Sequence, residues 1–139
     1  MRPRGNTQED YLLRIIRQAA ETLRRLRHLL AGGGGTPEVV RMDAVAATEA
    51  LLGSQASVLS LLDPLSAVTM VGHPAVVNVW VALLEVEAGA ADAMGDREIA
   101  ARRRARALAL REAAASIWGL AEEPRDESRA ASPAPTESA

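Results

Sequence analysis

The sequence has no cysteine and few aromatic residues among its 139 positions. The absence of thiols excludes disulfide bonds, zinc–thiolate centres and thiol nucleophiles. The aromatic residues are Tyr11, Trp80 and Trp118, whereas strands are usually enriched in aromatic residues and threonine. Leucine and alanine are abundant instead, and this composition favours helices packed around an aliphatic core. The length suits a single domain with a modest core.

A membrane-spanning helix needs roughly 20 apolar residues in succession, and we expect no segment of this chain to meet that requirement. Residues 1–10 lead into an amphipathic segment without the apolar stretch that is typical of a signal peptide. We therefore expect a cytoplasmic protein with no membrane span.

Capping signals and apolar periodicity divide the chain into helices. The spacing of Thr7 and Asp10 matches a capping box, so the first helix is expected to begin there. Apolar residues then recur every three or four positions as far as Leu30, and the run Gly32–Gly35 ends the helix. Several later starts carry a capping residue followed by proline. The expected helices are residues 8–31, 37–52, 55–62, 64–71, 74–94 and 97–118.

These helices predict an all-α fold, a small helical bundle over residues 7–120 that follows a flexible N-terminus over residues 1–6. Segment 74–94 is apolar around most of its circumference, which is typical of a central helix. Its valine-rich start could form a strand instead, but Asn78 interrupts the apolar run and no second strand candidate exists. Residues 121–139 lack bulky apolar side chains, so we expect a disordered tail.

The end of the bundle resembles a known helical hairpin. Residues 83–110 resemble the antiparallel helix pair of a tetratricopeptide repeat, with Gly95 in the turn and small Ala88, Ala100 and Ala107 at close-packing positions. Only one such unit is visible, whereas about three are needed for a stable solenoid, so a tetratricopeptide-like hairpin is expected without a repeat array.

A larger part of the chain, residues 9–118, resembles a family of small bacterial all-helical proteins of unknown function. The matching residues are the DYLLR-type segment Asp10–Ile16 near the start and the Gly95-Asp96 turn with Ala100. This resemblance implies the helical fold and the C-terminal hairpin, and it implies no particular activity.

The motifs of common catalytic sites are missing from the sequence. Nucleophile-elbow, phosphate-loop and zinc-protease patterns do not occur, and the run Gly32–Gly35 lacks the lysine and the preceding strand of a phosphate loop. Neither His28 nor His73 follows an acid by three residues, as carboxylate-bridged metal centres require. We expect no enzymatic activity, no metal and no cofactor.

The arginine-rich run Arg102–Arg104, with Arg106, could contact a nucleic-acid backbone. No aromatic residues interleave it, and segment 74–96 carries four acids and no basic residue. Mutual neutralisation of these two segments is therefore favoured over nucleic-acid binding.

Glu87 departs from the polar stripe of its helix and lies among apolar positions. A hairpin about the Gly95-Asp96 turn places Glu87 opposite Arg103 or Arg104. We expect a partly buried, structural ion pair there, because a carboxylate beside arginine keeps a low pKa.

The first helix is expected to supply a surface for a protein partner or for a second copy of the chain. Its apolar arc is wide, and the glycine run gives it freedom to move. The alternative is that this face is core within one chain, since a small domain needs every apolar face it has. The candidate surface comprises Leu12, Leu13, Ile16, Leu23, Leu26 and Leu29, with Arg24 and Arg27 at the rim.

The leading interpretation is a non-enzymatic helical protein–protein interaction module, an accessory or adaptor protein. Two further classes remain open. One is a peripheral binder of anionic surfaces, lipid or nucleic acid, that uses the arginines of the first and last helices. The other is an enzyme with an unrecognised acid–base site.

Overall fold

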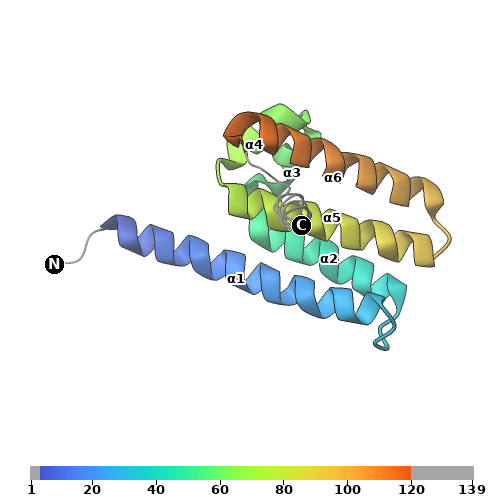
Figure 1. Cartoon of the computed structure of the whole chain (residues 1–139). Coiled ribbons are helices and arrows are strands. Elements are labelled where there is room, and N and C mark those ends of the chain that lie inside the picture. The colour runs from blue at the N-terminus through green and yellow to red at the C-terminus, as the bar shows by residue number, and fades with distance from the viewer. Residues whose placement is uncertain (1–3, 120–139) are drawn as a thin grey trace, which may run out of the picture.

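A computed structural model describes residues 4–119 of the chain (Figure 1). The described part is all-α and contains no strand, which confirms the predicted fold class. The predicted disordered tail, residues 121–139, lies outside the described residues. The elements in chain order are α1 (Arg4–Leu30), α2 (Pro37–Leu52), the short 3-10 turn η1 (Gly53–Gln55), α3 (Ala56–Leu61), α4 (Pro64–Val71), α5 (Pro74–Ala93) and α6 (Arg97–Trp118).

Local capping chemistry explains where two of the helices begin. The Thr36 side-chain oxygen accepts a hydrogen bond from the backbone N–H of Val39 at 3.3 Å, and a carboxylate oxygen of Asp63 accepts one from Ser66 at 3.1 Å. Each cap is followed by proline, whose missing N–H is not needed in the first turn. The predicted bounds of α2 and α4 are confirmed, as are those of α6, which begins without a side-chain cap.

The start of the first helix was predicted wrongly. Helix α1 begins at Arg4, so Thr7 lies inside the helix rather than at its cap, and residues 4–6 do not belong to a flexible N-terminus. Once a helix has nucleated, each added residue costs little, so α1 extends past a capping signal that would suffice on its own. The expected segment 55–62 is likewise divided into η1 and α3.

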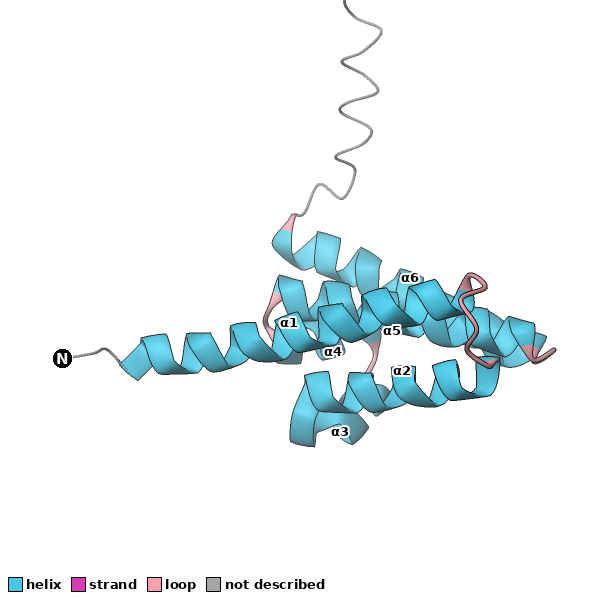
Figure 2. Ribbon diagram, turned by 90° about the horizontal axis from the view of Figure 1, so that it is seen from below, coloured by secondary structure: helices cyan, strands magenta, loops and turns pink. Residues whose placement is uncertain are grey.

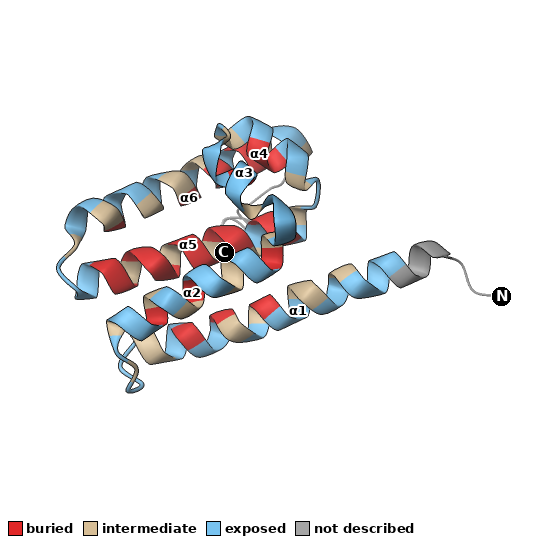
Figure 3. Cartoon of the chain, turned by 180° about the vertical axis from the view of Figure 1, so that it is seen from behind, coloured by how far each residue is buried: buried red, intermediate tan, exposed pale blue. Residues whose placement is uncertain are grey.

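Helix α5 occupies the centre of the fold. It packs against α6 on one side and against α2 and α1 on the other (Figure 1). Most of its side chains are buried, whereas α1 and α2 are buried along one face only (Figure 3). The largest side chains without solvent contact come from every α-helix and are Leu26, Val40, Leu59, Val68, Val77, Leu83 and Leu110.

Small residues allow α5 to approach its neighbours closely. Ala88 and Ala100 are fully covered where α5 and α6 meet near the turn. A Cβ atom added to Gly89 of α5 would lie 2.7 Å from Cδ2 of Leu30, so the Leu30 side chain at the end of α1 packs directly on this glycine. The expected close packing of the α5–α6 hairpin is therefore present.

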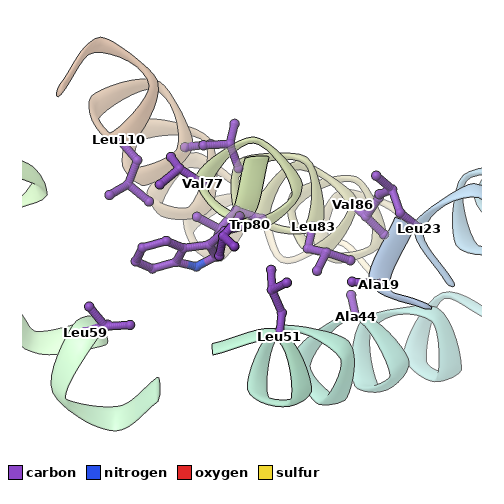
Figure 4. Close-up of a cluster of buried hydrophobic side chains, with 14 of the residues drawn as sticks. Ala19, Leu23, Ala44, Leu51, Leu59, Val77, Trp80, Leu83, Val86 and Leu110 are labelled. Atoms are coloured by element: carbon purple, nitrogen blue, oxygen red, sulfur yellow. The ribbon is translucent and has the colours of Figure 1, made fainter. Parts of the chain in front are cut away.

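The short helices α3 and α4 form a corner that covers one end of the α5–α6 hairpin. Helix α4 packs against α6, and α3 follows α2 and lies on the opposite side from α1 (Figure 2). Leu59 of α3 faces Trp80 of α5 across this corner (Figure 4).

Two segments of the described chain are long and apolar enough to cross a membrane, so the expectation that none exists is wrong by length and composition. The segment Pro74–Ala93 is the central helix, and 61% of its most apolar window is buried inside the fold. Only 17% of the most apolar window of the second segment, Pro37–Leu61, is buried, and the segment is interrupted by η1. Core helices of soluble proteins pass the same test.

Candidate functional site

Three ion pairs connect the central helix to α6. Arginines 103, 104 and 111 of α6 contact Glu87, Asp92 and Glu85 of α5 at 2.9, 2.7 and 2.6 Å. The arginines of the last helix are thus largely neutralised within the fold, as the charge pattern predicted. Arg104 is not the partner of Glu87, because its guanidinium contacts Asp92 instead.

Glu87 is the buried member of this set. Its side chain is 7% exposed, and Nε of Arg103 donates a hydrogen bond to its Oε1 atom at 2.9 Å. Burial nevertheless raises the pKa of Glu87, because loss of hydration outweighs the hydrogen bond and the positive charge of Arg103. The sequence-based expectation of a low pKa is therefore wrong. It considered the charge of the partner and not the depth of the carboxylate.

A cleft of about 690 Å³ opens between α2 and α3 on one side and the α5–α6 hairpin on the other. Glu87 and Arg103 contribute to its wall. Apolar side chains of α2 and α5 and hydroxyl groups of α3 complete the lining. The lining residues are Val45, Thr48, Glu49, Leu52, Gly53, Ser54, Ala56, Ser57, Ser60, Trp80, Leu84, Glu87, Arg103 and Arg106.

Arg106 fixes the shape of this cleft. Its two terminal nitrogens donate hydrogen bonds to the carbonyl oxygens of Leu59 and Leu62, each at 2.9 Å. Both carbonyls lie at the C-terminal end of α3, and that of Leu59 also accepts the backbone N–H of Leu62 at 3.3 Å. The guanidinium also lies 5.8 Å from the ring centroid of Trp80. One side chain of α6 therefore holds α3 against the central helix.

Trp80 forms part of the cleft wall although its side chain is almost fully buried. It is 3% exposed, and the indole extends into the space between Leu51 and Leu59 (Figure 4). Its N–H donates no hydrogen bond to another described residue, yet no deeply buried polar side-chain atom in residues 8–119 lacks a partner. The indole nitrogen therefore keeps some solvent contact, and Trp80 is one of the residues that line the cleft.

The candidate partner surface on α1 is divided by the structure. Leu23 and Leu26 are 8% and 0% exposed and belong to the core, so their assignment to a partner surface is wrong for this chain. They fill the space between α2 and α5. Leu12, Ile16 and Leu29 are half-buried at the edge of the same core.

The remaining candidates on α1 are open to solvent. Leu13 is 53% exposed, and the rim residues Arg24 and Arg27 are exposed as well. The fully buried positions of α1 begin at Ala19, and the first turns of the helix extend beyond α2 and α5 (Figures 1 and 3).

No cluster of three or more histidine, aspartate or glutamate side chains that could hold a metal ion occurs in residues 8–119. Sequence reasoning identified Glu87 and Arg103, but it named Arg106 only as a possible nucleic-acid contact and did not identify Trp80. No sequence pattern near Trp80 or Arg106 marks these roles, because both roles depend on where α3 lies in the folded chain.

No family model, curated protein or solved structure matches the chain. The resemblances to a tetratricopeptide unit and to a small bacterial helical family therefore remain predictions.

Proposed function

We propose that the chain is a non-enzymatic helical interaction module, an accessory protein that binds a second copy of itself through the N-terminal half of α1. The observation that carries this proposal is the exposed face of the projecting helix. Glu9, Leu13 and Arg17 are all exposed and are spaced four residues apart, so they form one stripe along it. The predicted tetratricopeptide-like character of the α5–α6 hairpin accords with such a module.

The length of α1 supports this assignment. Its 27 residues span about 40 Å, whereas the 16 residues of α2 span about 24 Å. The excess length lacks a neighbour within the described chain (Figure 1). Because a short isolated helix is marginally stable in water, contact with a second chain would stabilise the projecting part.

The order of charges along the stripe supports a second copy as the partner. In an antiparallel pair centred on Leu13, each Glu9 faces Arg17 of the other copy, and the two Leu13 side chains meet at the axis. A symmetric dimer then gains two opposite-charge contacts and one apolar contact from one repeated surface. Such a contact buries less than about 1,200 Å², so we expect a micromolar dissociation constant.

The proposal is tested by light scattering over a concentration series. Wild type should dimerise at roughly 100 μM, and Leu13→Glu should remain folded and monomeric. Leu108→Glu is the matched control, because Leu108 on α6 is 50% exposed and Leu13 is 53% exposed. Glu9→Arg should abolish the dimer, and the double variant Glu9→Arg, Arg17→Glu should restore it. A monomeric wild type, or a double variant that stays monomeric, would contradict the arrangement.

A second candidate, binding to an anionic surface, has one specific observation in its favour. The exposed arginines of α1 form no ion pair within the described residues, whereas four arginines of α6 do. The α1 residues are Arg14, Arg17, Arg24, Arg25 and Arg27. Sedimentation with phosphatidylserine vesicles tests this candidate. Binding that weakens steeply with salt and is lost on substitution of Arg24 and Arg25 would favour it.

A further inference from the structure

The cleft has the size and mixed chemistry of a small-molecule site. Its volume of about 690 Å³ lies within the range of roughly 300–1,000 Å³ that is usual for ligand pockets. Trp80 and Leu84 provide an apolar floor, and Ser57 brings a hydroxyl from the opposite wall. The same walls contain a buried acid and two arginines, so a ligand would meet both apolar surface and fixed charge.

Two donors of the cleft have no partner within residues 8–119. Arg103 contacts Glu87 through Nε, and its terminal nitrogens form no hydrogen bond to another described residue. The indole N–H of Trp80, on a side chain that is 97% covered, is the second. Arginine presents its terminal nitrogens as a planar pair of donors, which matches the two oxygens of a carboxylate.

The charge balance limits the kind of anion. Arg106 already donates to two backbone carbonyls, and Glu49 and Glu87 line the same cleft as the two arginines. The two negative charges thus balance the two positive charges. A multiply charged phosphate would be repelled by both carboxylates and would find only one arginine, Arg103, with free donors. A singly charged head with an apolar body matches the wall better.

We propose that the cleft binds a small organic monocarboxylate, with its carboxylate on the terminal nitrogens of Arg103 and the indole N–H of Trp80, and with its apolar body against Leu84, Leu52 and Val45. The site is separate from the face of α1 that carries the proposed self-association, so either proposal can fail without the other.

The carboxylate of the ligand and that of Glu87 share Arg103. A bound anion therefore favours the neutral form of Glu87, and removal of the charge on Glu87 should strengthen binding. A cationic ligand would depend on Glu87 in the opposite sense. The effect of one substitution on affinity thus reports the sign of the ligand.

The test uses the two tryptophans of the full-length chain, Trp80 and Trp118, as probe and internal control. Octanoate is titrated into ¹⁵N-labelled protein, and the indole N–H resonances are assigned with the Trp118→Phe variant. The Trp80 resonance should shift in a saturable manner while that of Trp118 stays in place. Octanol should bind at least about tenfold more weakly, because it lacks the charge-assisted hydrogen bonds, and octylamine should not bind.

Substitutions then locate the head group. Arg103→Gln should weaken octanoate binding by about tenfold or more, and Glu87→Gln should strengthen it several-fold. Arg104→Gln is the matched control, because Arg104 neighbours Arg103 in sequence but contacts Asp92 and does not line the cleft. Ser57→Phe, an exposed position on α3, should block the cleft without removing any charged partner.

Three results would overturn the proposal. The first is a Trp80 resonance that does not move up to roughly 10 mM octanoate, since that excludes even weak binding. The second is equal binding of octanoate and octylamine. The third is unchanged affinity in both Arg103→Gln and Ser57→Phe, which would place the ligand elsewhere.

Discussion

Glu87 and Arg103 form an ion pair whose two members are unequally buried. The side chain of Glu87 is 7% exposed, and that of Arg103 is 40% exposed. The acid therefore loses its hydration while the arginine keeps part of its own. Removing the arginine from such a pair costs more free energy than the pair itself contributes, because the buried acid is then left without a partner.

Arg103→Gln should lower the free energy of unfolding by about 2–3 kcal/mol, because it leaves a buried carboxylate without its cation. Adding Glu87→Gln to this variant should recover most of the loss, since two neutral amides carry no charge to hydrate. Urea unfolding of the two single variants and the double variant measures the coupling. Equal losses in Arg103→Gln and in the double variant would show that the acid does not need this partner.

The raised pKa of Glu87 predicts a pH dependence of stability. A carboxyl whose pKa is higher in the folded protein than in the unfolded chain binds its proton more tightly when folded. Its contribution is then fully present below the ordinary glutamate value of 4.5 and is lost as the pH rises through that value toward the raised folded pKa. Wild type should thus lose stability relative to Glu87→Gln over this interval. A stability difference that is flat with pH would contradict the dominance of burial.

Arg106→Met should destabilise the fold by about 2 kcal/mol, because two charge-assisted hydrogen bonds to the end of α3 are lost. The substitution also removes the guanidinium from the Trp80 ring, so the loss reports on the hydrogen bonds to Leu59 and Leu62 together with that contact. Arg102→Met is the control. Arg102 forms an exposed pair with Glu98 within α6, and such pairs contribute less than about 0.5 kcal/mol. Comparable melting temperatures for the two variants would show that α3 does not depend on Arg106.

The two halves of α1 should respond differently to truncation of leucine. Leu26→Ala should cost about 3 kcal/mol, because Leu26 has no solvent contact and its removal leaves a cavity. Leu13→Ala should cost less than about 0.5 kcal/mol when measured at a concentration where the chain is monomeric, because exposed substitutions rarely cost more. A large loss for Leu13→Ala in the monomer would place this residue in the core.

Local chemistry made most of the fold predictable from sequence. Pro37 and Pro64 follow side chains that accept hydrogen bonds from the first turns of α2 and α4, and this signal requires no knowledge of the rest of the chain. The start of α1 was predicted wrongly because a local signal cannot show where a helix stops extending. A capping pattern at Thr7 shows that a helix can begin there, and it does not prevent the helix from extending further.

The candidate site could be predicted only in part. The pairing of Glu87 with an arginine of α6 follows from the hairpin, because both helices share one short turn. The burial of Glu87 and the role of Trp80 depend on how α2 and α3 pack against the α5–α6 hairpin. Arg106 and the carbonyl of Leu59 are 47 residues apart, and no periodicity in either helix relates them.

That separation along the chain also sets an order of events during synthesis. Helices α2 and α3 leave the ribosome before the residue that binds the end of α3 has been translated, and their apolar segment Pro37–Leu61 is poorly covered even in the finished fold. Helix α6 therefore completes the corner last. Until α6 is in place, the nascent chain leaves this apolar segment still less covered, and a product truncated before α6 should aggregate more readily than the full chain.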